Sequence, residues 1–401
     1  MSDGIPPSSL RVAVYTDYLY RRVGDRVYGE RAFTLFLAAL GQRLGRLRLV
    51  GRLAPDDREL ARYPVGSSAE LVGLPYYPSL ARPLPALAAF ARSLRLLWRS
   101  LDDVDCAWLL GPHPLALMLS AMAVLRRRRL VLGVRQDLPR YVRSRHRGRR
   151  SLLLAAQTLE LAYRALARFC AVIVVGPELA RHYRRSRRLL EIAVSLVDAS
   201  QILPPAAVDR REYGGELTVL SVGRVDAEKN PLLLAEVLAR LLEGEPRWRL
   251  VVCGEGPMLE ALGARLRELG IADRATLPGY LPLDGGLLEL YRESHVLLHV
   301  SWTEGVPQVI FEAFGAALPV VATDVGGIRD ALDDAVRLVP RGDARAAAGA
   351  VAALAGDPAQ RRQLVGAGHR RVSETTRDAV ASRVARFLAG QPDRERVERR
   401  A

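Results

Sequence analysis

The chain has 401 residues, of which 49% are hydrophobic and 6% aromatic, and its formal net charge is +15. This composition is that of a soluble globular protein with room for two domains. Three scattered cysteines (Cys106, Cys170 and Cys253) exclude a disulfide framework or a zinc motif. The longest apolar run, residues 114–125, is too short to span a bilayer. We therefore expect a cytoplasmic protein.

The positive charge is concentrated in the first half of the chain. Residues 1–200 carry 33 arginines and 16 acidic residues, a balance of +17, whereas residues 201–401 have a balance of −2. The asymmetry indicates either an anionic partner for the first half or a solvated arginine-rich surface. Residues 85–101 form a basic amphipathic pattern with Arg92, Arg95, Arg99 and Trp98, which favours peripheral binding to an anionic membrane surface, at the inner face.

Short apolar runs alternate with helical patterns along the whole chain. In the first half we predict strands at residues 11–15, 47–51, 106–110, 130–134 and 171–175. In the second half we predict them at residues 217–222, 249–253, 275–277, 295–300, 319–323 and 336–339. Buried parallel strands joined by helices have this pattern, so we expect an α/β fold with two Rossmann-like, doubly wound domains.

The predicted boundary between the domains lies near Val194–Asp209, where Pro204-Pro205 interrupts the pattern. We expect an N-terminal acceptor-binding domain at residues 1–195 and a C-terminal donor-binding domain at residues 196–377. A helix at residues 378–391 is expected to cross back to the N-terminal domain, and residues 392–401 form a charged tail.

The first chemical motif follows the strand predicted at residues 217–222. Gly223 and Arg224 come directly after this strand, and Lys229 precedes Asn230-Pro231, an expected helix start with Asn230 as N-cap. Arginine and lysine beside a helix N-terminus suit a diphosphate. Lys229 is the only lysine in the chain, against 58 arginines, and the two side chains are not interchangeable at a phosphate.

Three further motifs also follow predicted strands. Gly254 and Gly256 lie in CGEGP, where glycines permit close backbone approach, and PVVATDVGG supplies another glycine turn. The strongest motif is SWTEGVPQVIFEAFG, in which Glu304 lies in a turn and Glu312 lies eight residues on, within a helix starting near Pro307. One carboxylate can accept hydrogen bonds from sugar hydroxyls and the other from a ribose diol. Ligands collect at the carboxyl ends of strands in such sheets.

These motifs, in this order and spacing, resemble the retaining glycosyltransferases of family 4, which have the GT-B architecture of two Rossmann-like domains facing a central cleft. The resemblance is specific over residues 217–340. It implies that Arg224 and Lys229 hold the donor diphosphate, that Glu304 contacts the transferred sugar and that Glu312 binds the ribose. It further implies donor contacts from Gly223, Gly254, Gly256, Gly305, Val306, Pro307 and Gln308.

The first half departs from this family at two places. Members usually have a Gly-Gly pair before the first helix, where this chain has Tyr28-Gly29, so that only Gly29 remains for the donor. The family also often has a histidine after the strand that matches residues 130–134, where this chain has Arg135. His113 follows an earlier strand and is either a catalytic residue on the acceptor side or an ordinary loop histidine.

The resemblance predicts an enzyme that moves a sugar from a nucleotide-diphosphate sugar, UDP-sugar before GDP-mannose, to a hydroxyl acceptor. We expect no metal and no cofactor, since the two cations replace a metal ion, and the Asp103-Val104-Asp105 motif precedes a strand, on the wrong side of the sheet. A dinucleotide-binding oxidoreductase is one alternative, although residues 14–30 lack Gly-x-Gly-x-x-Gly. A basic nucleic-acid-binding protein is another, although no nucleic-acid module is visible and no nucleic-acid partner is expected. A non-catalytic relative would be expected to lack some of the four motifs.

Overall fold

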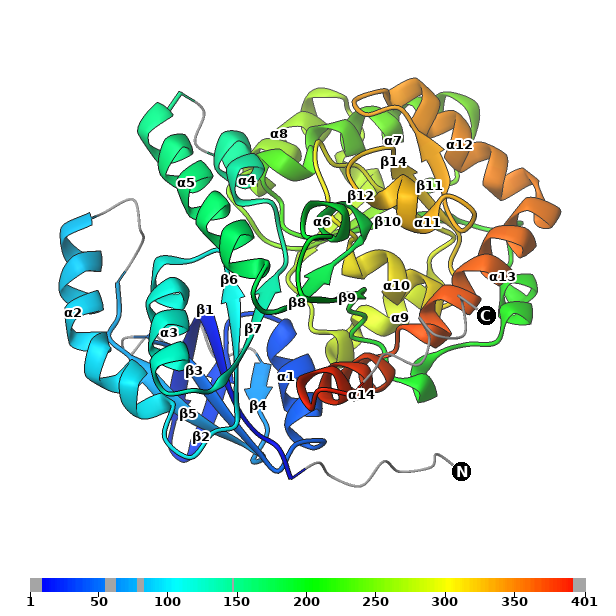
Figure 1. Ribbon diagram of the computed structural model, residues 1–401. Helices are drawn as coiled ribbons and strands as arrows, with labels where there is room; N and C mark the ends of the chain where they lie inside the picture. Colours follow the sequence, from blue (N-terminus) through cyan, green and yellow to red (C-terminus); the bar gives the residue numbers. More distant parts are fainter. Residues whose placement is uncertain (1–8, 55–62, 78–82, 146–147, 392–401) are drawn as a thin grey trace. The chain divides into compact units, whose positions relative to one another are not determined.

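The computed structural model describes residues 9–54, 63–77, 83–145 and 148–391 (Figure 1). The chain forms two compact units. The N-terminal unit comprises Met1–Leu196 together with Arg377–Ala401, and the C-terminal unit comprises Val197–Thr376. Each unit is a parallel sheet with helices on both faces, so the predicted α/β, doubly wound fold is confirmed.

The sheet of the N-terminal unit has the parallel order β5-β3-β1-β6-β7-β8-β9. Its first strand, β1, lies in the middle, as in Rossmann folds. Two short strands, β2 and β4, add an antiparallel extension to β1. The strands are β1 (Arg11–Val23), β2 (Arg26–Gly29), β3 (Arg46–Leu53), β4 (Tyr63–Val65), β5 (Ala69–Leu74), β6 (Cys106–Gly111), β7 (Arg129–Val134), β8 (Ala171–Val175) and β9 (Arg188–Ile192).

Helices cover both faces of this sheet because successive side chains of each strand point to opposite sides. Val12 and Val14 of β1 belong to a core that includes α1 (Phe33–Gly41) and α14 (Arg377–Leu388). Ala13 and Tyr15 belong to a second core with α2 (Pro83–Ser100), α3 (Pro114–Leu125) and α5 (Arg150–Ala167), which lie on the other side of the sheet in Figure 1. The remaining helices are α4 (Leu138–Arg145), which packs on α5, and α6 (Pro177–His182).

The sheet of the C-terminal unit has the order β12-β11-β10-β13-β14-β15. Strands β10 to β12 build one half of the sheet, and β13 then pairs with the other side of β10. Its strands are β10 (Leu217–Val222), β11 (Trp248–Cys253), β12 (Ala275–Gly279), β13 (Val296–His299), β14 (Val320–Thr323) and β15 (Arg337–Val339). One face packs on α7 (Leu232–Gly244), α8 (Leu259–Glu268) and α12 (Ala344–Gly356). The other helices are α9 (Leu288–Glu293), α10 (Gln308–Gly315), α11 (Ile328–Leu332) and α13 (Pro358–Glu374), which packs on α10.

All eleven predicted strands are present, with small differences at their ends. The prediction for β1 was too short, because the strand continues from Tyr15 to Val23 and turns into β2. Strands β2, β4, β5 and β9 were not predicted. They are short or lie at the margin of the sheet, with half-exposed residues such as Glu70 and Glu191 that weaken the apolar signal.

Candidate functional site

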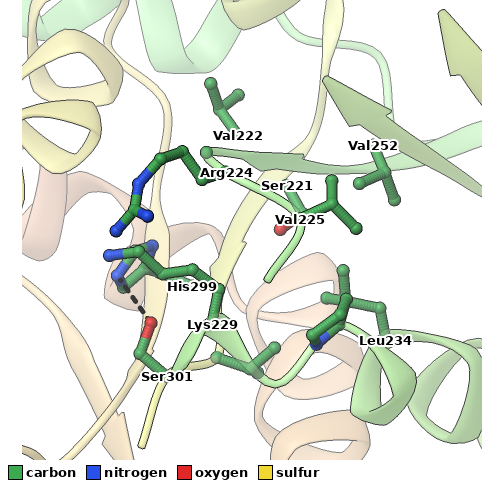
Figure 2. A pocket seen from close by; sticks show the side chains of 12 residues that line it. Ser221, Val222, Arg224, Val225, Lys229, Leu234, Val252, His299 and Ser301 are labelled. Carbon is green, nitrogen blue, oxygen red and sulfur yellow. Dashed lines mark hydrogen bonds between the residues drawn. The ribbon is translucent and has the colours of Figure 1, made fainter. Parts of the chain in front are cut away.

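A pocket opens at the carboxyl ends of β10 and β13. Figure 2 shows the charged ends of Arg224 and Lys229 pointing to the same side of this pocket as the imidazole of His299. The parallel strands place these groups together because their carboxyl ends meet at one edge of the sheet. The pocket is lined by Ser221, Val222, Gly223, Arg224, Val225, Lys229, Pro231, Leu234, Val252, His299, Val300 and Ser301.

Lys229 reaches this pocket from a single 3₁₀ turn rather than from the start of a helix. Residues Ala227–Lys229 form the turn, and Asn230 ends it in the left-handed conformation, with φ of 50°. The expectation that Asn230 caps the following helix is therefore wrong, since Pro231 occupies the N-cap position of α7. Asparagine tolerates positive φ because its short polar side chain adds little steric conflict. The sharp turn directs Lys229 back across the pocket.

Glu304 receives three polar contacts from the walls of this pocket. Its Oε1 accepts hydrogen bonds from Lys229 Nζ, from His299 Nε2 at 2.8 Å and from Ser301 Oγ at 2.7 Å. Burial by itself raises the pKa of Glu304, but the charge of Lys229 and the hydrogen bond from His299 together bring the pKa well below its usual range. The carboxylate is therefore ionised and oriented, with Oε2 left to accept from a ligand.

Arg224 is also paired with acidic residues. Its guanidinium binds the carboxylates of Asp226 and Glu228. Glu228 in turn is fixed by its backbone, because its carbonyl oxygen accepts from the N–H of Trp302 at 2.9 Å. A planar guanidinium held by two carboxylates is oriented in advance and retains donors for a further anion. Both predicted cations thus lie at the pocket, each with an acidic partner.

The segment after Glu304 supplies free backbone donors at the start of α10. The N–H groups of Gly305, Val306 and Gln308 have no hydrogen-bond partner among the described residues. The predicted set included Pro307, whose nitrogen carries no hydrogen, so Pro307 contributes only its fixed φ of −68° at the N-cap position. Three donors beside an oriented carboxylate can bind the hydroxyls of a sugar.

Glu312 differs sharply from Glu304 although only eight residues separate them. It is 6% exposed on α10, and its Oε2 accepts a hydrogen bond of 2.8 Å from the hydroxyl of Tyr291, itself fully buried on α9. Burial raises the pKa of Glu312 to about 6, and the hydrogen bond from Tyr291 offsets only part of this rise. This carboxyl can change its protonation state near neutral pH.

The glycines of the pocket loops have a packing role that the sequence did not reveal. A Cβ at Gly254 would lie 1.8 Å from the carbonyl oxygen of Gly223, and one at Gly256 would lie 2.3 Å from that of Val225. Gly326 stands in the same relation to Glu304, at 1.8 Å from its carbonyl oxygen. At these positions the backbone of one loop therefore lies against the backbone of another loop of the protein. Gly254 and Gly256 do not line the pocket described above.

His113 lies in the N-terminal unit and is 5% exposed. Its Nδ1 accepts from the N–H of Leu115 at 3.2 Å, as the cap of α3, and lies 2.7 Å from the hydroxyl of Tyr15. Its Nε2 lies 3.0 Å from the hydroxyl of Tyr77, which donates to Asp17 at 2.5 Å. Both ring nitrogens thus have protein partners, and burial lowers the pKa of His113. A catalytic role for His113 stays a prediction.

Gly29 is placed by the structure in an unexpected element. It ends β2 rather than opening a helix, and α1 begins four residues later at Phe33. A Cβ at Gly29 would lie 2.2 Å from Thr34 Oγ1, so a larger residue there would require the side chain of Thr34 to move. Its predicted donor contact remains a prediction.

His299 and Ser301 were not predicted as site residues. Both are buried at the end of β13 and complete the polar surroundings of Glu304. A signal was present, because His299 is a polar residue inside an apolar strand that ends immediately before the glutamate motif. A histidine buried at the carboxyl end of a strand needs a polar partner, and here that partner is Glu304.

Comparison with known proteins relates this site to a family. Residues 207–371 match the model of the family described as glycosyl transferases group 1. A D-inositol 3-phosphate glycosyltransferase of Kribbella flavida is 33% identical over 228 residues, which are 53% of each chain. Sucrose-phosphate synthase of Thermosynechococcus elongatus superposes with a TM-score of 0.71 at 18% identity, over 95% of this chain and 98% of that one. Anabaena Alr3699/HepE in complex with UDP-glucose superposes with a TM-score of 0.66 at 16% identity, over 95% of this chain and 100% of that one.

The extent of these matches differs between sequence and structure. The chain spans between 38% and 53% of the length of five D-inositol 3-phosphate glycosyltransferases. The solved structures match nearly the whole chain, and at their low identity this likeness concerns the fold. The family segment contains Arg224, Lys229, Glu304 and Glu312. Residues 207–371 are therefore similar to glycosyl transferases group 1, and the fold of the chain is similar to that of solved GT-B structures.

Proposed function

We propose that the protein is a retaining glycosyltransferase that uses a nucleotide-diphosphate sugar, with UDP-sugar favoured and GDP-mannose next. The single observation that carries this proposal is the pocket where Arg224, Lys229 and the oriented carboxylate of Glu304 come together. Two cations suit a diphosphate, while a carboxylate beside free N–H groups suits sugar hydroxyls. The match to glycosyl transferases group 1 and the UDP-glucose bound by HepE support the same donor class.

In the proposed reaction the bond between the anomeric carbon and the phosphate oxygen breaks, and the acceptor oxygen bonds to the anomeric carbon on the same face. The acceptor proton passes to the departing phosphate. Arg224 and Lys229 neutralise the charge that grows on the diphosphate, without a metal ion, while Oε2 of Glu304 holds the sugar. Because both cations are paired with carboxylates, the diphosphate must compete with Glu228 for Arg224 and with Glu304 for Lys229.

A thermal-shift screen tests the donor class. UDP-glucose, UDP-N-acetylglucosamine, GDP-mannose, ADP-glucose and NAD are compared on wild type and on Glu312→Ala. We expect a nucleotide sugar to raise the unfolding midpoint of wild type and to have less effect on the variant. Stabilisation by NAD alone would favour the oxidoreductase, and salt-sensitive binding of DNA without any nucleotide effect would favour the nucleic-acid alternative. D-inositol 3-phosphate, named for the relatives, is the first acceptor to supply.

Nucleotide affinity is expected to fall when the pH drops below about 6. Below the raised pKa of Glu312 its carboxyl binds a proton and loses its negative charge and part of its capacity to accept hydrogen bonds from a ribose diol. Above that pKa the affinity should be constant, since Glu304 stays ionised throughout. Calorimetric titration with UDP-glucose, whose diphosphate diester does not titrate from pH 5 to 8, measures the effect, about tenfold per pH unit at most. Glu312→Gln should bind more weakly and lose this pH dependence, and a pH profile unchanged in Glu312→Gln would contradict the assignment.

We also propose that the N-terminal unit binds an anionic membrane surface. The helices α2, α3 and α5 bury one side against the sheet, and their outer sides present large apolar residues to solvent. These exposed residues are Leu84, Leu87, Leu94, Trp98, Val124, Leu125, Leu154 and Leu161, followed by Phe169. Exposed arginines on and beside the helices have no ion pair with a described acidic residue: Arg92, Arg95, Arg99, Arg127 and Arg168. Apolar side chains among unpaired arginines suit an anionic lipid surface. Among the described residues no helix is long and apolar enough to cross a membrane.

Replacing Arg92, Arg95 and Arg99 together with glutamine is expected to weaken binding to anionic vesicles by on the order of 100-fold, at about 1 kcal/mol per arginine. Flotation with phosphatidylcholine vesicles, with and without 30% phosphatidylglycerol, measures this. The fluorescence of Trp98 offers a second measure of vesicle binding. Trp302→Phe removes the other exposed tryptophan, and Trp108 and Trp248 are buried. Equal binding to neutral and anionic vesicles would contradict the proposal.

A further inference from the structure

Arg135 is a partly buried cation that has no acidic partner in the described part of the chain. It follows β7 directly and therefore lies at the carboxyl edge of the N-terminal sheet, where ligands of such folds collect. Among the described residues it has no ion pair, whereas Asp137, two residues on, is occupied by the N–H of Arg140 at 2.8 Å and lies 3.7 Å from His182. Burial lowers the pKa of Arg135 to about 10, and the group still carries its charge at neutral pH.

Aromatic rings hold the guanidinium in place. Its carbon lies 4.1 Å from the ring centre of Phe33 and 5.7 Å from that of Tyr18. The two rings are themselves packed edge to face at 6.4 Å. Stacking on aromatic rings leaves the N–H groups at the edge of the guanidinium available, and these are the donors that bind a phosphate through two parallel hydrogen bonds. A desolvated cation without a counter-ion is unfavourable unless an anion joins it.

We propose that Arg135 binds a phosphoryl group of the acceptor substrate. The inference rests on the proposed function, because it assigns the chemical class of that enzyme's acceptor. The rings of Phe33 and Tyr18 set the plane of the guanidinium, and the bound phosphate supplies the counter-charge that the protein lacks at this place. The site therefore selects phosphorylated acceptors over their neutral counterparts.

Binding measurements on wild type, Arg135→Gln and Arg184→Gln test this assignment, with D-inositol 3-phosphate, myo-inositol and UDP as separate probes. Arg184→Gln is the matched control, since it removes the charge of an exposed arginine in the turn after α6. Wild type should bind the phosphorylated probe at least tenfold more tightly than myo-inositol. Arg135→Gln should lose that preference and keep its affinity for UDP, whereas Arg184→Gln should behave as wild type.

Thermal unfolding without ligand shows whether Arg135→Gln folds normally. We expect its unfolding midpoint to lie within a few degrees of that of wild type. The proposal is overturned if wild type does not distinguish the two inositol probes, or if Arg135→Gln keeps the preference. Loss of UDP affinity with an unchanged preference would also overturn it and would place the bound phosphate on the donor. Intact UDP binding with no phosphate preference refutes this inference alone, while absence of any nucleotide-sugar binding refutes the proposed function.

Discussion

Lys229→Ala is expected to reduce sugar transfer by about 10²–10³-fold, as removal of one electrostatic stabiliser of a transition state does. The ammonium is the compact cation of the pocket, and it binds Oε1 of Glu304. Its loss removes charge neutralisation from the diphosphate and leaves Glu304 with only the hydrogen bonds of His299 and Ser301. Steady-state kinetics with the donor found in the screen measures the loss in kcat and in kcat/KM.

The pH profile of activity separates an effect of Lys229→Ala on Glu304 from a general loss of activity. Removing the cation raises the pKa of Glu304, so protonation of Glu304 should add a second loss of activity at acid pH in Lys229→Ala, besides the loss that Glu312 causes. Lys229→Arg keeps the charge but not the compact shape, and it should restore activity only in part. The Lys229→Ala/Glu304→Ala double variant should recover stability lost by the single variant without recovering activity. Activity within threefold of wild type in Lys229→Ala would refute the role.

Gly326→Ala is expected to destabilise the protein by about 2–4 kcal/mol and to abolish most of the transfer activity. Gly326 has φ of +58°, a region that alanine avoids, and its added Cβ would lie 1.8 Å from the carbonyl oxygen of Glu304. The Glu304 loop must move to relieve this overlap. Movement of that loop separates Glu304 from Lys229 and His299 and so disturbs the site as well as the fold.

Gly349→Ala is the matched control for this substitution. Gly349 is exposed within α12, and a Cβ there would meet nothing within 4 Å. Alanine in a helix should stabilise by about 0.5–1 kcal/mol, and activity should be unchanged. Urea unfolding of both variants, followed by tryptophan fluorescence, measures the difference. A Gly326→Ala protein as stable and active as Gly349→Ala would show that the loop tolerates displacement.

Much of the fold and part of the site could be predicted because their signals are local. Buried parallel strands need apolar runs, so the strands of the C-terminal unit were located to within a few residues. Arg224, Lys229 and Glu304 were identified because each follows such a strand, and strand ends share one edge of the sheet. Strands β2, β4, β5 and β9 escaped prediction because short or half-exposed strands leave little apolar signal.

The sequence by itself determined the doubly wound fold and the set of charged residues at the strand ends, since periodicity and motif order are properties of the chain. Only the tertiary structure decided which group each residue contacts. It paired Lys229 with Glu304, surrounded that carboxylate with His299 and Ser301, and stacked Arg135 on Phe33 with no described acidic residue beside it. These contacts join residues up to 102 positions apart, and their strength depends on burial and distance, which no local pattern encodes.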